Sequence, residues 1–189
     1  MLQIRPTGPY LPDNIGFMAR CNGLSDPQEV IQKTLTTEYM VFGLGDVYLG
    51  APCAVPLDPR CRMVVPKYNP ARTWTPEGGV GIGGAYLCIY PMESPGGYQL
   101  FGRTLPIWNT QAPRPWLLNL FDRIQFEEVS EEELTHLRND VLTGKGEFKI
   151  EESQFSLKDY TQFLASVEDE TKAFNTRQSK AIMSATEGC

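Results

Sequence analysis

Glycines crowd residues 75–104, and their spacing is the first feature that could do chemistry. Gly79, Gly81 and Gly84 fit G-x-G-x-x-G, a pattern that in nucleotide-binding proteins places phosphates at a helix N-terminus. That use needs a buried strand before the motif and a helix after it. Here Pro76 interrupts the residues before it, and the residues after it, AYLCIY, are typical of a strand. We therefore interpret these glycines as positions where a strand bends or another backbone comes close.

Histidine and cysteine offer little material for nucleophilic catalysis. The single histidine, His136, lies in a segment that reads as an exposed helix with Ser130 as its N-cap, so a Ser–His–Asp or Cys–His mechanism is not expected. The five cysteines are odd in number and none shares C-x-x-C spacing. They predict free thiols in a cytoplasmic protein, with neither a disulfide framework nor a metal site.

The composition of the chain argues against two classes of partner, nucleic acid and membrane. The chain has 189 residues, 41% of them hydrophobic, and a formal net charge of −6. A negative chain is a poor ligand for nucleic acid, and no apolar run is long enough to span a membrane. We expect one sizeable domain that binds neither nucleic acid nor membrane.

The hydrophobic pattern predicts a mainly β fold with helices at both ends. Helices are expected at 12–22, at 26–36 with Ser25 as N-cap, from Ser130 onward, and beyond Ser156. The segments expected to form strands are 37–45, 61–65, 80–90, 98–108, 115–129 and 146–152. The segments 46–60 and 66–79 read as irregular loops. A closed or nearly closed antiparallel barrel over about residues 37–151 would explain the glycine-kinked strands. One or two helices are expected beyond Ser156, of which the first should pack on the barrel and the last would need a partner to stay ordered.

Three stretches carry a resemblance to a known family: YMVFGLGDVYLGAPCAVPLDPR, KYNPARTWTPEGGVGIGGAYLCIY and ESPGGYQLFGRT. They resemble the carboxyltransferase region of urea carboxylase, the biotin-dependent half of fungal urea amidolyase. The region is also similar to allophanate hydrolase subunit 1, to one of the subunits of bacterial 5-oxoprolinase and to a bacterial histidine-kinase inhibitor. The resemblance implies a cyclophilin-like β-barrel at 37–155, a remnant of a small α/β subdomain at 1–36, and a C-terminal helical tail at 156–189.

The resemblance also implies a reaction, the transfer of a carboxyl group from carboxybiotin to urea to give allophanate. Biotin would arrive on a separate carrier domain, and a partner carboxyltransferase half would be needed. The substrate would be urea or a close amide such as guanidine. In such chemistry the cofactor supplies the reactivity, while the protein supplies positioning and oxyanion stabilisation. A homo-oligomer is left open.

The matching loops supply the candidate residues. The resemblance implies catalytic roles for Asp46, Lys67 and Arg72. It implies substrate binding by Tyr48, Asn69, Thr73, Tyr86, Glu93, Ser94, Gly97, Gln99 and Arg103. We expect the loops with Asp46, 67–73 and 93–99 to converge on one rim, and Arg103 to face the barrel mouth or pair with Glu93 or Asp46. The alternatives are that Asp46 caps its own loop, that 67–73 is ordinary surface loop, that 93–99 is a hairpin turn, and that the tyrosines belong to the core.

Two departures from the family pattern leave other functions open. Cys61 stands where the family's Asp-Pro-Arg-His-Arg has histidine, and Pro66 stands where threonine is common. The chain could instead be a stand-alone barrel without carboxylase activity. It would then be either a binding or regulatory module, like the kinase inhibitor, or an enzyme recruited to another pathway, such as an isomerase or cyclase.

Overall fold

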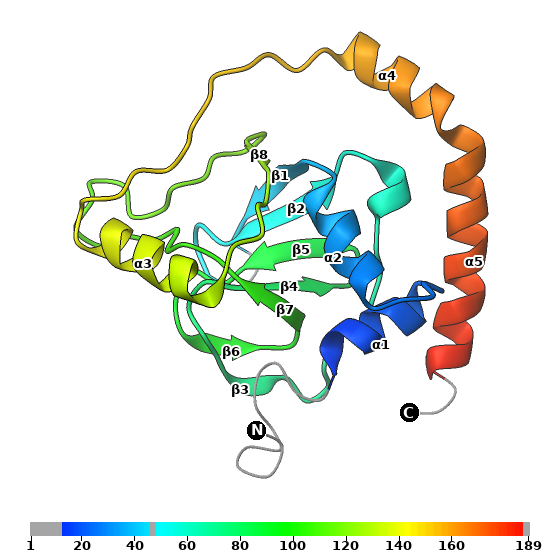
Figure 1. Ribbon diagram of the computed structural model, residues 1–189, viewed down its shortest axis with the longest axis horizontal. Coiled ribbons are helices and arrows are strands. Elements are labelled where there is room, and N and C mark those ends of the chain that lie inside the picture. The colour runs from blue at the N-terminus through cyan, green and yellow to red at the C-terminus, as the bar shows by residue number, and fades with distance from the viewer. Residues whose placement is uncertain (1–12, 46–47, 187–189) are drawn as a thin grey trace.

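Six antiparallel strands form the main sheet of the computed structural model, which describes residues 13–45 and 48–186 (Figure 1). The strands lie in the order β7-β4-β5-β2-β1-β8. Their bounds are β1 (Tyr39–Leu44), β2 (Pro52–Pro56), β4 (Gly79–Gly83), β5 (Tyr86–Ile89), β7 (Gln99–Arg103) and β8 (Arg123–Ile124). Two further strands, β3 (Arg72–Thr75) and β6 (Ser94–Gly96), pair with each other in a separate sheet.

The predicted class, mainly β with antiparallel strands and helices at both ends, is confirmed. Closure of the sheet is not seen. Strands β7 and β8 are the two edges, and within the described ranges no strand pairing joins them. The main sheet is therefore open in its hydrogen bonding.

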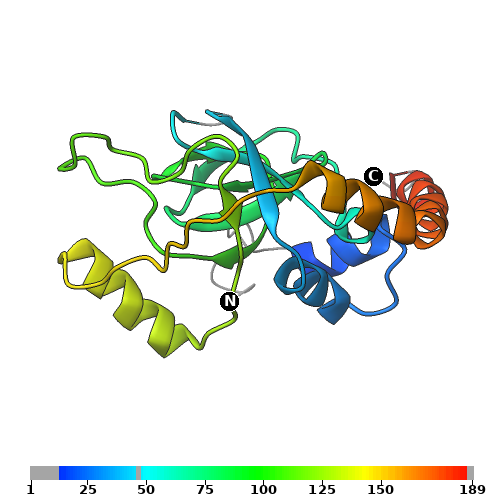
Figure 2. The ribbon, with the colours of Figure 1, turned by 90° about the horizontal axis from the view of Figure 1, so that it is seen from above.

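Five helices accompany the sheet: α1 (Asn14–Cys21), α2 (Gln28–Leu35), α3 (Glu131–Leu142), α4 (Leu157–Ser166) and α5 (Glu168–Thr186). A short 3-10 helix, η1 (Pro59–Cys61), follows β2. Helices α1 and α2 cover one side of the sheet (Figure 2), where Met18 and Val30 pack in one cluster with Val41, Ile82 and Leu87. Because both helices contribute to this cluster, the residues before Tyr39 are part of the core.

The glycine-rich segment forms a hairpin. Gly83 pairs with Tyr86, so the expected single strand 80–90 is two strands joined at Gly84–Ala85. Gly84 has a φ of +62°, which glycine adopts without steric cost at such a turn. A Cβ on Gly83 would lie 2.4 Å from Cδ1 of Tyr98. The glycines therefore serve a turn and a close approach, as interpreted, and no helix begins at Gly84.

Several predicted elements are wrong. Strands β2 and β3 lie in segments expected to be loops, because their prolines and polar residues hid them. The expected strand 61–65 begins inside η1, and Val65 forms a single bridge with Gly84. Residues 98–108 and 115–129 contribute only β7 and β8. Residues 146–152 form no strand, and the backbone N–H of Gly146 donates to the Asp140 carbonyl at the end of α3 at 2.9 Å.

The helix caps agree only in part with the sequence. Ser130 and Ser156 accept hydrogen bonds from backbone N–H groups in the first turns of α3 and α4, respectively. Ser25 does not cap α2, since its hydroxyl donates to Oε1 of Glu29 at 2.7 Å. That carboxylate also accepts from the Ser25 amide, and these hydrogen bonds, the serine hydroxyl's first, lower the pKa of Glu29.

The C-terminal helices form an arm, defined here as residues 143–186, that arcs away from the sheet and returns beside α1 (Figure 1). Helix α4 contributes no buried residue, and its Tyr160 hydroxyl donates to the Leu57 carbonyl at 2.9 Å. Helix α5 buries Phe174 and Gln178 against the body. The first of these helices was expected to pack on the barrel, but it is α5, the last helix, that makes the main contact with the body. No described helix is both long and apolar enough to cross a membrane.

Candidate functional site

Two of the predicted loops meet. Residues 66–72 lie against Gly97–Leu100, an arrangement we call the clamp. Three hydrogen bonds join its sides: the Tyr68 N–H to the Gly97 carbonyl at 2.6 Å, Gln99 Nε2 to the Pro66 carbonyl at 3.0 Å, and Arg72 Nη2 to the Tyr98 carbonyl at 2.6 Å. The clamp therefore brings together Lys67, Asn69, Arg72, Gly97 and Gln99 from the predicted site.

A buried asparagine ties the clamp to α1. Asn14, 3% exposed, donates from Nδ2 to the Leu100 carbonyl at 2.8 Å and accepts from the Tyr68 hydroxyl at 2.7 Å. Burial raises the pKa of Tyr68 and the nearby charge of Arg72 works against this rise, so the phenol stays protonated and can donate. The sequence reasoning missed Asn14 because it treated residues 12–22 only as a helix with apolar positions.

Both cations of the clamp lie over aromatic rings. The guanidinium carbon of Arg72 is 5.0 Å from the centroid of Tyr68, and Nζ of Lys67 is 4.6 Å from that of Tyr98. Cation–π contacts of this length orient a charged head without neutralising it. Arg72 is half-buried and Lys67 is exposed, so Lys67 presents its charge to solvent while Arg72 braces the loop.

Polar atoms also lie buried beside the clamp. Ser94 and Thr75 face each other across β6 and β3, and their hydroxyls have no hydrogen-bond partner among the described residues. The same holds for Oε1 of Gln99, whose side chain is 3% exposed. Buried polar atoms without partners cost about 1–3 kcal/mol each. Gln99 belongs to the clamp, whereas Thr75 and Ser94 form the pair of β3 and β6 farther from it, so buried polar atoms extend from the clamp along these two strands.

The expectation of a single rim is wrong for the β1–β2 loop. Gln99 pairs near the end of β4 and Arg103 pairs at its start. Strands β4, β5, β2 and β1 run antiparallel in turn, so Leu44 and the loop after it lie at the Arg103 end. At about 3.3 Å per residue, a five-residue strand separates the two ends by roughly 15 Å. Asp46 itself lies outside the described residues.

The other candidates are divided between these ends. Tyr48 lies in the β1–β2 loop, whose Leu49 carbonyl accepts from the Trp108 indole at 2.9 Å. Glu93 is exposed and precedes β6 at the same end. Arg103 donates to the Glu77 carbonyl at 3.0 Å, and its Nη2 lies 3.8 Å from the Glu77 carboxylate. It was expected to face the barrel mouth or pair with Glu93 or Asp46, and the recorded partner is Glu77 instead.

Two exposed candidates lie nearer the clamp. Thr73 follows Arg72 on β3. Tyr86, 46% exposed, starts β5 beside the hairpin turn and therefore is not a core residue. Both side chains can be reached from solvent, whereas Tyr90 and Tyr98 of the neighbouring segments are buried.

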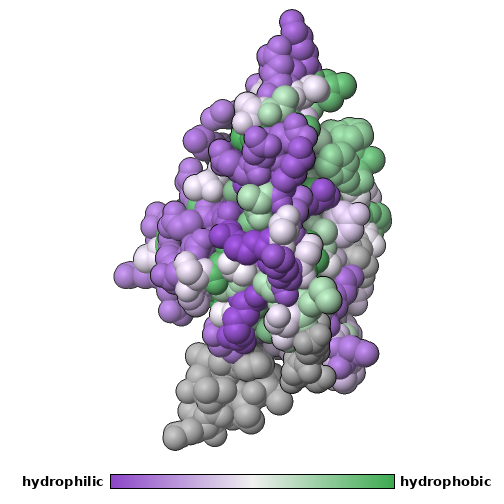
Figure 3. Space-filling model, turned by 90° about the vertical axis from the view of Figure 1, so that its right-hand side faces the viewer, coloured by the Kyte–Doolittle hydropathy of each residue, from purple (hydrophilic) through white to green (hydrophobic). Residues whose placement is uncertain are grey.

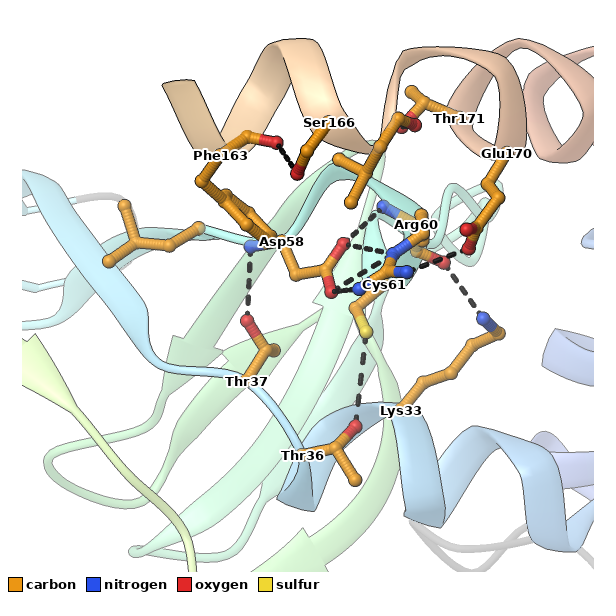
Figure 4. Close-up of polar contacts among 12 residues, drawn as sticks. Lys33, Thr36, Thr37, Asp58, Arg60, Cys61, Phe163, Ser166, Glu170 and Thr171 are labelled. Carbon is orange, nitrogen blue, oxygen red and sulfur yellow. Dashed lines mark hydrogen bonds and ion pairs between the residues drawn. The ribbon is translucent and has the colours of Figure 1, made fainter. Parts of the chain in front are cut away.

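Cys61 lies in a separate polar cluster around η1 (Figure 4). The thiol is 6% exposed and lies 3.9 Å from the Thr36 hydroxyl. Burial, and then the charge of Asp58, raise the pKa of Cys61, so the thiol is protonated and a poor nucleophile. Cys21, Cys53 and Cys88 are likewise thiols outside any disulfide, as predicted, while Cys189 lies outside the described residues.

The described residues contain no group of three His, Cys, Asp or Glu side chains that could bind a metal ion. His136 is exposed and lies 3.3 Å from Asp140 one helical turn away, consistent with a surface residue. The chemistry available at the clamp is therefore that of two cations, two side-chain amides and hydroxyls. Such a set suits binding of a planar polar group and stabilisation of its negative oxygens.

Comparison with known proteins identifies the family. The sequence profile described as "Carboxyltransferase domain, subdomain C and D" matches residues 7–118, more than half of the chain. The chain belongs to this family. Its similarity to urea amidolyase of Saccharomyces cerevisiae is 47% identity over 93% of the chain, and to a putative urea carboxylase of Emericella nidulans 41% over 94%. The chain spans only 10% and 15% of these two relatives, respectively.

A solved structure and a bacterial relative support the same family assignment. The urea carboxylase of Kluyveromyces lactis is 45% identical with a TM-score of 0.84, covering 96% of this chain and 17% of that one. Another relative, a 5-oxoprolinase subunit of Bacillus subtilis, is 35% identical over 67% of this chain and 51% of its own length. The predicted family resemblance is therefore confirmed, and the chain corresponds to one part of much larger enzymes.

Proposed function

We propose that the chain is the carboxyltransferase subdomain of a urea carboxylase-type, biotin-dependent enzyme, which transfers a carboxyl group from carboxybiotin to urea to give allophanate. Biotin would be carried by a separate domain, and a partner carboxyltransferase half would complete the site. The proposal concerns an assembled enzyme, since the matching relatives are many times longer than this chain.

The observation that carries the proposal is the extent of the similarity. The urea carboxylase structure covers 96% of the chain, and the uncovered share is shorter than either α4 or α5, so both helices are at least partly covered. The 5-oxoprolinase relatives cover 53–67% of the chain. The urea carboxylase-type relatives therefore match the body and the arm together, which favours their activity over the alternatives.

The clamp fits a ureido or amide group. Such a group is planar, with N–H donors on one edge and a carbonyl oxygen on the other. Lys67 offers a cation to oxygen atoms, and Oε1 of Gln99 offers an acceptor to N–H groups. Both residues belong to the clamp, where Nε2 of Gln99 is fixed by the Pro66 carbonyl. The side chains present therefore match the polar edges of urea and of the biotin ring.

Each residue would have a distinct task. Bound carboxybiotin would supply an activated carboxyl group. Lys67 would bind the negative oxygens of that group, and Gln99 would orient urea through an N–H group. Arg72 would act as a positioning residue, since its contacts with Tyr98 and Tyr68 fix the loop that carries Lys67. The buried hydroxyls of Ser94 and Thr75 would provide further polar contacts away from bulk water.

The test uses a full-length carboxylase that carries this sequence, with carboxylation of urea measured as isotope-labelled allophanate. Lys67→Ala should lower kcat about 100-fold, the usual cost of removing one oxyanion donor. Arg72→Ala removes the charge-assisted hydrogen bond to the Tyr98 carbonyl that fixes the loop of Lys67, so it should weaken urea binding by up to about 1.5–3 kcal/mol, the worth of that hydrogen bond. Lys180→Ala, which removes an exposed cation from α5, is the matched control and should leave both parameters unchanged.

A wild-type enzyme that carboxylates no urea would refute the proposed reaction. Full activity in both clamp variants would instead refute the assignment of the site. Guanidine, assayed beside urea, distinguishes between the two amide substrates.

A further inference from the structure

A pocket of about 500 Å³ lies between α2, η1 and α5. It is apart from the clamp, and its lining residues are Lys33, Arg60, Glu170, Ala173, Phe174 and Arg177. Figure 4 shows Lys33, Arg60 and Glu170 converging there from three elements of the fold. Three of the six lining side chains are cations and one is a carboxylate, although the whole chain carries a net charge of −6. Positive charge is therefore concentrated at this pocket.

Only one of the three cations is neutralised. Arg60 forms ion pairs of 2.7 Å with both Asp58 and Glu170. Lys33 donates from Nζ to the carbonyl oxygen of Arg60 at 2.8 Å, which uses one N–H bond without compensating the charge. In the described part of the chain, neither Lys33 nor Arg177 forms an ion pair. Lys33 and Arg177 therefore border the pocket without a direct ion pair, although the charge of Lys33 also lowers the pKa of Asp58 and that of Arg177 the pKa of Glu29.

These two cations lie over the same ring. Nζ of Lys33 is 4.7 Å from the centroid of Phe174, and the guanidinium carbon of Arg177 is 5.5 Å from it. The two charges are thus within about one Debye length, roughly 8–10 Å, and repel each other. An anion held in the pocket within reach of both cations would relieve this repulsion. Phe174, which is 5% exposed, forms the apolar floor.

The geometry points to a second ligand site: we propose that this pocket binds a phosphate group, either free or carried by a small metabolite. Two cations with unused N–H groups suit the several oxygens of a phosphate. The view that faces α5 shows a largely hydrophilic surface (Figure 3). Because the pocket is lined by α5 and by two elements of the body, a bound ligand would fasten the arm to the body. Binding to the folded state alone also stabilises that state.

The test is isothermal titration of the 189-residue chain with inorganic phosphate and with pyrophosphate, at an ionic strength kept constant with sodium chloride. We expect saturable binding to a single site. Arg177→Gln should weaken it about tenfold, the loss expected for one charge-assisted hydrogen bond. Glu170→Gln should tighten it severalfold, since it removes the one carboxylate among the six lining side chains, while Arg60 keeps its pair with Asp58. Lys180→Gln removes a cation of the same helix outside the pocket lining and should change nothing.

Absence of saturable binding by the wild-type chain would overturn the proposal. Equal weakening by Arg177→Gln and Lys180→Gln would also overturn it, because diffuse attraction to surface charge would then explain the signal. Circular dichroism of each variant separates loss of the site from loss of fold, and Arg177→Lys, which keeps the charge, should retain part of the affinity. Neither biotin nor urea enters this assay, so its outcome is independent of the proposed carboxyl transfer.

Discussion

The two ends of helix α1 carry the same residue type in different surroundings. Asn14 lies in the first turn and Asn22 at the C-cap, and both are buried. Asn14 joins the helix to the clamp, whereas Asn22 joins it to the arm. One end therefore belongs to the part of the molecule that positions a reactive loop, and the other to the part that fastens the C-terminal helices.

At the Asn22 end the hydrogen bonds are mostly to backbone. Nδ2 donates to the carbonyls of Met18 at 2.7 Å and Val64 at 3.2 Å. Oδ1 accepts from the Val64 N–H at 2.8 Å and from Nε2 of Gln178 at 2.7 Å. Nε2 of Gln178 also donates to the Arg62 carbonyl. One buried amide thus fixes α1, the segment after η1 and α5 to one another.

At the Asn14 end one hydrogen bond is to a tyrosine side chain, and that tyrosine ring contacts a cation. Asn14 accepts from Tyr68, and Tyr68 lies under the guanidinium of Arg72. The amide there orients an aromatic ring and, through it, a cation. We infer that the Asn22 end serves stability and the Asn14 end serves the precision of the clamp.

Replacing Asn22 should have the largest effect on stability. Asn22→Ala removes four hydrogen bonds and takes the acceptor away from the Val64 amide, while Gln178 keeps only its hydrogen bond to the Arg62 carbonyl. We expect a loss of about 3 kcal/mol in the free energy of unfolding. Urea denaturation followed by circular dichroism measures it. Asn175→Ala, on the exposed face of α5, is the control and should change stability by less than about 0.5 kcal/mol. A small loss at Asn22 would contradict the structural role of that end.

The Asn14 end should respond differently. Tyr68→Phe removes the hydroxyl that donates to Asn14 but keeps the ring under Arg72, so stability should fall by about 1 kcal/mol. Because the clamp loop would be less well oriented, kcat of the assembled enzyme should fall by more than this stability loss suggests, while the pH profile stays unchanged. Steady-state kinetics beside urea denaturation separate the two quantities. If activity followed stability alone, Tyr68 would be a structural residue only.

The fold class could be read from the sequence because it rests on local patterns. Runs of apolar residues indicated β1 and β7, the Ser130 cap indicated where α3 begins, and the apolar spacing beyond Ser156 indicated α4. Strand β2 was missed because its prolines, Pro52 and Pro56, usually mark loops. They are tolerated here since both stand at the ends of the strand. The turn at Gly84 was missed because a single glycine with a positive φ leaves the same sequence signature as a kink.

The sequence selected two loops that meet in the structure and one loop that lies at the other end of the sheet. Residues 67–73 and 97–99 meet because the hydrogen bonds of the clamp join them, and a resemblance of motifs was enough to select both. The β1–β2 loop was assigned to the same rim because sequence order gives no strand register. Asn14 and Asn22 could not be found, since their roles depend on long-range contacts with Tyr68 and Gln178.

Near the Asn22 end, the cluster around η1 contains a carboxylate whose contribution to stability depends on pH. Burial raises the pKa of Asp58, but hydrogen bonds and charge from Arg60 outweigh it, so the pKa is lowered. Its contribution to stability is therefore present above the unfolded pKa near 4 and is lost as the pH falls through the folded value. Asp58→Asn should cost about 1 kcal/mol or less at pH 7, since the pair is partly solvated. Urea denaturation at pH 7 and pH 3 should show the difference shrinking, whereas Glu152→Gln, an exposed control, should show none.

The smallest effect on stability is expected for the exposed ion pair between Arg60 and Glu170 in the same cluster. Glu170 binds Arg60 at 2.7 Å, but its side chain is 66% exposed and Arg60 keeps its contact with Asp58 when Glu170 is replaced. Glu170→Gln should therefore change the free energy of unfolding by less than about 0.5 kcal/mol, the usual range for a solvated pair. Combining it with Asn22→Ala in a double-mutant cycle measures any coupling between the ion pair and the buried amide. Near-additive losses would show that buried hydrogen bonds fasten the arm independently of the ion pair, while a coupling above about 1 kcal/mol would mean that the charges around η1 share that task.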